Sequence, residues 1–273
     1  MDVCAKLRGK FHEKRVGHGG TLDPMATGVL PVFLGRATRA VEYATGSTKQ
    51  YVAGLRLGMV TNTQDTSGEV LEQRPVLAKR EDVAAALAGF RGELEQIPPM
   101  YSAVKKDGKK LYELARKGIE VERKPRPVTI YGLELLGEDG ENGDYRLRVT
   151  CSKGTYVRTL CHDIGQALGC GGCMSSLRRT QAAGYTLEDA VCLEQVLEDP
   201  APEKWLRGTD TCFRSYPALT ISDRAAFKAR NGSPFPTRAA DGYYRVYDGT
   251  GEFLLLGRAE AGRMGTIKSF FEV

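Results

Sequence analysis

Alternation between apolar and polar residues predicts a set of strands. From Asp144 to Cys151 every second residue is apolar or aromatic, which is the period of two of a strand that buries one face. The runs from Gln50 to Gly58 and from Pro127 to Leu136 have β-like patterns too. We therefore expect these three segments to contribute strands.

Two helices are predicted from apolar residues that recur every three to four positions. Lys79 to Phe90 carries such residues on one face, and Tyr156 to Leu168 carries a second apolar stripe. Gly169 follows the second stripe directly, and glycine commonly ends helices. The second helix therefore begins shortly after the strand that ends at Cys151.

A change of pattern divides the chain towards its C-terminal end. Glu198 to Asp210 is mostly polar and holds two prolines, so we place a boundary there, between a domain of residues 1–212 and one of residues 213–273. The short strands expected beyond it are Tyr243 to Tyr247, Glu252 to Gly257 and Thr266 to Glu272. Short strands joined by glycine-containing turns predict a small barrel.

The composition is that of a globular protein. The 273 residues contain no apolar run near the roughly 18–20 residues that a membrane span needs, so no membrane partner is expected. The seven cysteines are scattered and odd in number, which favours reduced thiols in the cytoplasm over a disulfide framework.

Positive charge is concentrated in one segment, from Tyr101 to Arg126, which we call the basic segment. It holds nine basic and four acidic residues, and this excess equals the net charge of +5 of the whole chain. Tyr101 and Tyr112 lie within it. Clustered cations with aromatic residues are typical of nucleic-acid binding, although a solvated basic helix has the same composition.

Metal and nucleotide chemistry have little support in the sequence. Cys170 and Cys173 have the spacing of a ligand pair, but a structural zinc site usually has two such pairs. The sequence contains no P-loop, no Gly-x-Gly-x-x-Gly turn and no Gly-x-Ser-x-Gly elbow. We expect neither a metal nor a cofactor.

The candidate chemistry lies between Gly17 and Pro31. This stretch holds four glycines, two prolines and a single acidic residue, Asp23. Such a loop lets a flat ligand approach the backbone beside one nucleophile or base, but Asp-Pro is also a common turn starter. Arg158 lies at the predicted strand-to-helix junction, where it can hold a carboxylate ionised through a bidentate pair or contact phosphate or solvent.

Several blocks, in order, resemble one family over nearly the whole chain. They are Gly17–Pro24, Ala26–Gly28, Lys49–Tyr51, Leu57–Gly58, Thr61–Asp65, Ile97–Lys105, Gly108–Glu113, Ser152–Thr159 and Leu177–Thr180. These blocks resemble the bacterial tRNA pseudouridine-55 synthases of the TruB type. The resemblance implies an α+β pseudouridine synthase fold, with a mixed, largely antiparallel central sheet flanked by helices and a small PUA-like C-terminal barrel.

The resemblance also implies an activity and its residues. The activity is isomerisation of uridine 55 in the T loop of tRNA, with the base flipped out, no cofactor, and a monomer that needs no protein partner. Asp23 matches the essential aspartate, Tyr51 the tyrosine that packs on the base and takes the C5 proton, and Arg158 the arginine that pairs with the aspartate. The matched substrate-binding positions are His18, Tyr51, Tyr156, Leu177, Lys105 and Lys109.

The sequence departs from the family pattern in a few places. The family usually begins with a strand and a Lys-Pro-x-Gly-x-Thr-Ser segment before the position of Asp2. We therefore expect either that the true start lies upstream of Met1 or that an edge strand is missing. Gly19 stands where threonine is common, and Asn62 where aspartate is common. The last two departures remove no proposed catalytic group. The basic segment, the C-terminal barrel and the missing strand keep a second hypothesis open, a non-catalytic protein that binds or folds tRNA.

Overall fold

The computed structural model describes residues 2–139 and 144–271, and the chain forms two compact units. The sheet unit comprises Thr21–Leu30 and Gly46–Ala190. The terminal unit comprises Met1–Gly20, Pro31–Thr45 and Val191–Val273. The loop that carries Asp23 therefore belongs to the same unit as Arg158.

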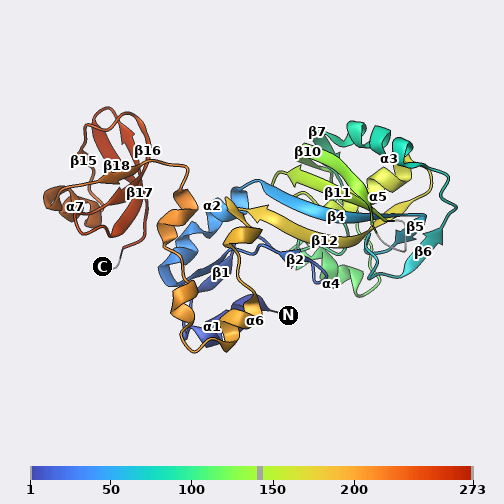
Figure 1. Cartoon of the computed structure of the whole chain (residues 1–273), viewed down its shortest axis with the longest axis horizontal. Coiled ribbons are helices and arrows are strands. Elements are labelled where there is room, and N and C mark those ends of the chain that lie inside the picture. The colour runs from blue at the N-terminus through green and yellow to red at the C-terminus, as the bar shows by residue number, and fades with distance from the viewer. Residues whose placement is uncertain (1, 140–143, 272–273) are drawn as a thin grey trace. The chain divides into compact units, whose positions relative to one another are not determined.

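Within the described residues, the sheet unit is built on a sheet of seven strands (Figure 1). They are β2 (Thr27–Gly28), β4 (Lys49–Leu57), β7 (Gly92–Gln96), β10 (Arg126–Asp139), β11 (Asp144–Cys151), β12 (Gly172–Ala182) and β13 (Tyr185–Thr186). The strand order is β13-β12-β4-β11-β10-β7, with antiparallel neighbours, and β2 pairs with β12 in parallel. The three strands predicted from alternation are confirmed as β4, β10 and β11.

Helices cover the apolar face of this sheet. Leu55 from β4 and Leu147 from β11 are fully buried against α5 (Val157–Ala167), α3 (Arg80–Ala86) and the 3-10 turn η2 (Leu87–Phe90). Both predicted helices are therefore confirmed, because their apolar stripes have this face to cover. The remaining elements of the unit are β5 (Met59–Thr61), β6 (Val70–Gln73), β8 (Lys105–Lys106), β9 (Lys109–Lys110), α4 (Leu111–Ala115) and η3 (Leu187–Asp189).

The central strand β12 was not predicted. Bulges between Met174 and Ser176 and between Arg179 and Gln181 interrupt its pairing with β4, and each bulge shifts the side chains from one face to the other. In addition, Arg179 faces inward with no exposed surface. A strand with a broken period and an inward-facing arginine does not have the alternation on which sequence-based prediction depends.

The terminal unit combines two short strands, several helical turns and a half-barrel. Its elements are α1 (Val3–Lys10), β1 (Val16–His18), β3 (Val32–Leu34), η1 (Gly35–Ala40), α2 (Val41–Gly46), α6 (Leu193–Glu198), η4 (Pro202–Trp205), η5 (Thr209–Phe213), β14 (Ala218–Thr220), α7 (Asp223–Arg230), β15 (Phe235–Pro236), β16 (Gly242–Tyr247), β17 (Phe253–Glu260) and β18 (Arg263–Ser269). In the described part of the chain, β14-β16-β17-β18-β15 form one sheet with its own apolar core.

The last predicted strand is displaced along the chain. It was expected from Thr266 to Glu272, whereas β18 begins at Arg263 and ends at Ser269; Glu272 itself lies outside the described residues. Ala261 and Gly262 both have positive φ, at 50° and 74°, as in the tight hairpin turns that place strands directly opposite one another. Along residues 2–139 and 144–271, no helix combines the length and apolar character that crossing a membrane requires.

Candidate active site

The loop Thr21–Leu30 is fixed to the sheet at one end. Its strand β2 pairs with Arg178 and Arg179 of β12, and the Val29 amide donates to the Arg179 carbonyl at 2.8 Å. Gly28 has a φ of +99°, and a Cβ there would lie 2.2 Å from the Arg179 carbonyl oxygen. Only glycine permits this approach, so the loop returns to the sheet five residues after Asp23.

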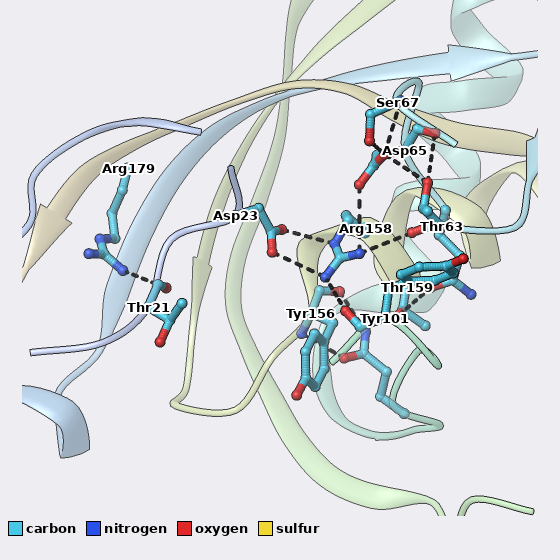
Figure 2. A network of polar contacts seen from close by, with 12 residues as sticks. Thr21, Asp23, Thr63, Asp65, Ser67, Tyr101, Tyr156, Arg158, Thr159 and Arg179 are labelled. Carbon is cyan, nitrogen blue, oxygen red and sulfur yellow. Dashed lines mark hydrogen bonds and ion pairs between the residues drawn. The ribbon is translucent and has the colours of Figure 1, made fainter. Parts of the chain in front are cut away.

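The expected pairing of Asp23 with Arg158 is present as an ion pair with one side-chain hydrogen bond (Figure 2). Arg158 Nε lies 2.9 Å from Asp23 Oδ2, and Nη2 donates to Oδ1 at 3.1 Å. The Arg158 side chain is 6% exposed, whereas that of Asp23 is 29% exposed. The arginine is therefore buried behind a carboxylate that solvent or a ligand can reach.

The rest of the Arg158 guanidinium is also held by acceptors. Its Nη1 donates to the Thr63 carbonyl at 3.1 Å, and its Nη2 donates to the Tyr101 carbonyl at 3.1 Å. Asp65 Oδ2 lies 3.6 Å from Nη1, and the Asp65 side chain is only 7% exposed. A forked donor set with so many fixed partners can rotate very little, so the direction of Asp23 is fixed as well.

Asp65 is a site residue that the sequence reasoning missed. Asp23 has no acidic neighbour in its own loop, yet the fold places Asp65 on the other side of the same guanidinium (Figure 2). Asp65 Oδ1 accepts hydrogen bonds from the Thr63 hydroxyl at 2.8 Å and the Ser67 amide at 3.0 Å. The spacing Thr63-x-Asp65-x-Ser67 was the available signal, since Asp commonly accepts bonds from residues two positions away.

Burial and charge act on Asp23 in opposite directions. Burial raises the pKa of this carboxyl above its usual value, the Arg158 charge lowers it, and Asp65 raises it again, with a net increase. The expectation that Arg158 favours the anion is confirmed, but burial outweighs it. The Asp23 anion is therefore poorly solvated, and on acidification it is lost at a higher pH than that of an unperturbed aspartate.

Tyr51 and Leu177 lie in the sheet beside this loop. Tyr51 in β4 is 8% exposed and opposes Arg179 of β12. Burial raises the pKa of its hydroxyl, whereas Arg179, by charge and a side-chain hydrogen bond, lowers it, and Asp23 raises it. Leu177 in β12 is 6% exposed and belongs to the same core as Tyr51. Both expected residues therefore lie in the unit that holds Asp23.

The other expected site residues have varied surroundings. Tyr156 precedes α5, and its amide and carbonyl are both hydrogen-bonded to Gln96, at 2.8 and 3.0 Å. Lys105 and Lys109 are exposed on the β8–β9 hairpin. His18 is in β1 of the terminal unit, where its Nδ1 accepts a bond from the Gly20 amide at 3.3 Å. The structure thus joins Asp23 and Arg158 directly, and it leaves the role of the other residues as a prediction.

Metal binding has no support among the described residues, which contain no group of three His, Cys, Asp or Glu side chains suited to holding an ion. Cys170 and Cys173 are both buried free thiols. Burial raises the pKa of Cys173 to about 11, which disfavours the thiolate that a metal requires. Cys173 is therefore a poor metal ligand despite the spacing of the pair.

Comparisons with known proteins agree with this arrangement. Residues 8–157 match the TruB family pseudouridylate synthase N-terminal domain, and residues 158–209 match the tRNA pseudouridylate synthase B C-terminal domain. The chain is 46% identical over 270 residues to tRNA pseudouridine synthase B of Pseudomonas fluorescens (strain Pf0-1), covering 95% of this chain and 87% of that protein. It is 41% identical over 276 residues to the Clostridium kluyveri protein of the same name, covering 99% and 94%.

A solved structure extends the likeness to the fold. The crystal structure of a Cbf5-Nop10-Gar1 complex contains a chain that aligns with a TM-score of 0.71 at 27% identity, covering 98% of this chain and 80% of that one. The mixed sheet, together with these matches, defines a pseudouridine synthase fold. The chain belongs to the TruB family of pseudouridylate synthases, and it is accordingly an isomerase.

Proposed function

We propose that this enzyme isomerises uridine 55 in the T loop of tRNA to pseudouridine, with Asp23 as the essential carboxylate. The observation that carries the proposal is the Asp23–Arg158 ion pair. The buried arginine, with its Nε 2.9 Å from Asp23 Oδ2, orients an aspartate that is partly exposed. The substrate class comes from the relatives, whose names describe tRNA pseudouridine synthases at 41–46% identity. The T loop and position 55 come from the resemblance of the motifs.

The chemistry is an isomerisation, so atoms and electrons balance without a cofactor. The bond from uracil N1 to the sugar breaks, the base turns, and a bond from C5 to the same sugar carbon forms. The C5 proton then leaves and N1 gains one. A target base inside a helical stack must first be flipped out. Asp23 assists as a nucleophile or by removing a proton, and Arg158 stabilises its anion.

The remaining residues receive roles in binding. Tyr51 supplies an aromatic face for the base, and such stacking is worth roughly 1–3 kcal/mol per base; its hydroxyl takes the C5 proton. His18, Tyr156 and Leu177 shape the pocket. Lys105 and Lys109 contact phosphates, and Lys105 also lines a surface pocket of about 240 Å³ among other cations of the basic segment. Phosphate contacts of this kind make affinity fall with salt.

The same proposal assigns residues 213–273 to a PUA-like RNA-binding domain and residues 1–212 to catalysis. The half-barrel in the described C-terminal residues supports this, because its core of residues such as Val246 and Leu254 is its own. Comparing the tRNA affinity of the whole chain with that of a chain ending at Cys212, after checking that both unfold cooperatively, tests the assignment. Equal affinities contradict it.

The decisive experiment uses an unmodified tRNA transcript labelled with tritium at C5 of uridine. Purified enzyme should release about one tritium per tRNA, and carbodiimide mapping should place the product at position 55. A transcript with cytidine at position 55 is the matched control and should release none. Binding without release, or equal release from both transcripts, contradicts the proposal. Turnover by this chain alone, eluting near 29.9 kDa, also tests whether it acts as a monomer without a protein partner.

A further inference from the structure

A second arginine, Arg179 of β12, is fully buried next to the loop that carries Asp23. Its exposed surface is 0%, and burying a guanidinium is costly unless its donors meet acceptors. Arg158 contacts the Asp23 carboxylate itself. Arg179 contacts the main chain of the same loop, and these partners indicate what it does.

The Arg179 side chain reaches both ends of the loop. Its Nε donates to the Val29 carbonyl at 2.7 Å. Its Nη1 donates to the Thr21 carbonyl at 3.4 Å (Figure 2). Thr21 precedes Asp23 by two residues, and Val29 follows it by six. One planar group therefore joins the start and the end of the segment from which Asp23 projects, as a rigid fork can and a single ammonium cannot.

The main chain of the same residue holds the loop a second time. Arg179 opposes Gly28 in the β2–β12 pairing, and its carbonyl accepts the Val29 amide at 2.8 Å. The contact is so close that a Cβ on Gly28 would lie 2.2 Å from the Arg179 carbonyl oxygen. Any shift of Arg179 along β12 therefore moves the loop with it.

Arg179 also contacts the second group of the proposed chemistry. It opposes Tyr51 across the β12–β4 pairing, and its side chain is hydrogen-bonded to the Tyr51 hydroxyl. A single buried residue thus contacts the Asp23 loop at two carbonyls and Tyr51 at its hydroxyl. The distance between Asp23 and Tyr51 then depends on one rigid side chain.

We propose that Arg179 is a positioning residue, which sets the Asp23 loop and the Tyr51 hydroxyl in register so that both act on the same base. The inference rests on the proposed function, since it assumes that Asp23 and Tyr51 act in one reaction. Misplacing a reacting group by about 1 Å costs on the order of 100-fold in rate. Substrate affinity depends on other surfaces, so rate and affinity should separate.

The test is Arg179→Lys, which keeps the buried charge and removes the fork. The single-turnover rate of tritium release should fall about 100-fold, while the tRNA dissociation constant stays within about threefold and unfolding remains cooperative. Hydrogen exchange should become faster in the peptide that contains the Val29 amide. The matched control is Arg56→Lys, which breaks a bidentate pair with Asp144 at 2.8 and 2.9 Å in the same sheet and should leave the rate unchanged.

Several results overturn the inference. They are a rate for Arg179→Lys within threefold of wild type, a rate loss matched by an equal loss of affinity, and an equal loss in Arg56→Lys. If Arg179→Lys does not fold, Gly28→Ala carries the test, because its Cβ pushes the loop off an intact Arg179. It should lose rate and keep affinity, and a wild-type rate overturns the inference. Wild-type enzyme that releases no tritium from uridine 55 instead contradicts the proposed function.

Discussion

Two segments of the sheet unit differ in how their charged groups are buried and paired. The Asp23 loop holds one acidic residue, anchored by Arg158 and Arg179, which are 5% and 0% exposed. The basic segment holds nine cations, and those that face solvent include Lys105, Lys109 and Lys124. Buried charge that is hydrogen-bonded to several fixed acceptors fixes geometry, whereas exposed charge attracts a polyanion without fixing it. The proposed function accordingly assigns chemistry to the Asp23 loop and binding to the basic segment.

The Arg158 side chain connects the two segments through its Nη2 atom. The carbonyl of Tyr101, the first residue of the basic segment, accepts a hydrogen bond from Arg158 Nη2 at 3.1 Å. The same Nη2 donates to Asp23 Oδ1 at 3.1 Å. Arg158 therefore contacts both the Asp23 carboxylate and the start of the basic segment. If the assignment of roles is right, substitutions in the loop site change rate, and substitutions at the exposed cations change affinity.

The largest effect among the supporting residues is expected for Tyr51→Phe, which keeps the ring and removes the hydroxyl. Proton transfer by a positioned side chain contributes about 10²- to 10⁴-fold, so the single-turnover rate should fall at least about 100-fold with little change in affinity. Tyr145→Phe is the matched control, since Tyr145 is also 8% exposed but lies in β11. A fully active Tyr51→Phe rejects the role of the hydroxyl as proton acceptor.

A smaller, pH-dependent effect is expected for Arg158→Lys. Burial already raises the pKa of Asp23, and the arginine opposes that increase. Without the fork the pKa rises further, so the anion is lost at a higher pH as the solution is acidified. The single-turnover rate should fall about 10- to 100-fold near pH 6 and less near pH 8. An acid limb that moves to lower pH, or does not move, contradicts this account.

The smallest effect is expected where charge is exposed. Lys105→Gln with Lys109→Gln should raise the tRNA dissociation constant about 3- to 10-fold and reduce the slope of log affinity against log salt by about 1.5. The rate at saturating enzyme should stay unchanged. Lys79→Gln with Arg80→Gln removes the same charge at the start of α3 and should leave the slope unchanged. Equal slopes in both double variants dismiss the assignment of phosphate contacts to the basic segment.

The sequence predicted the regular parts of the fold and the directly paired groups. β11 has regular apolar–polar alternation and α5 has a regular apolar stripe, so their positions were predicted correctly. The chemistry of a lone carboxylate and an arginine indicated the Asp23–Arg158 pair. The family resemblance added the mixed sheet, which the pairings confirm. These features depend on local pattern or on blocks of residues that stand together in the sequence.

The missed features depend on contacts between distant residues. Asp65 reaches the site only because Thr63 and Asp65 fold against the Arg158 side chain. Arginine is rarely buried, and the carbonyls of Thr21 and Val29, which help to make the burial of Arg179 possible, lie far from it in the sequence. The direction in which the Asp23 pKa shifts could not be predicted from the sequence either, because it depends on how deeply the folded chain buries the carboxyl.

The most direct measurement compares wild type with Asp23→Asn on the same tritium-labelled tRNA, at saturating enzyme and with affinity measured in parallel. The amide has nearly the shape of the carboxylate but can neither attack nor remove a proton. The account predicts that turnover by Asp23→Asn falls at least about 10⁴-fold, below detection, while the dissociation constant stays within about threefold. Turnover near that of wild type contradicts the central claim that Asp23 carries the reaction.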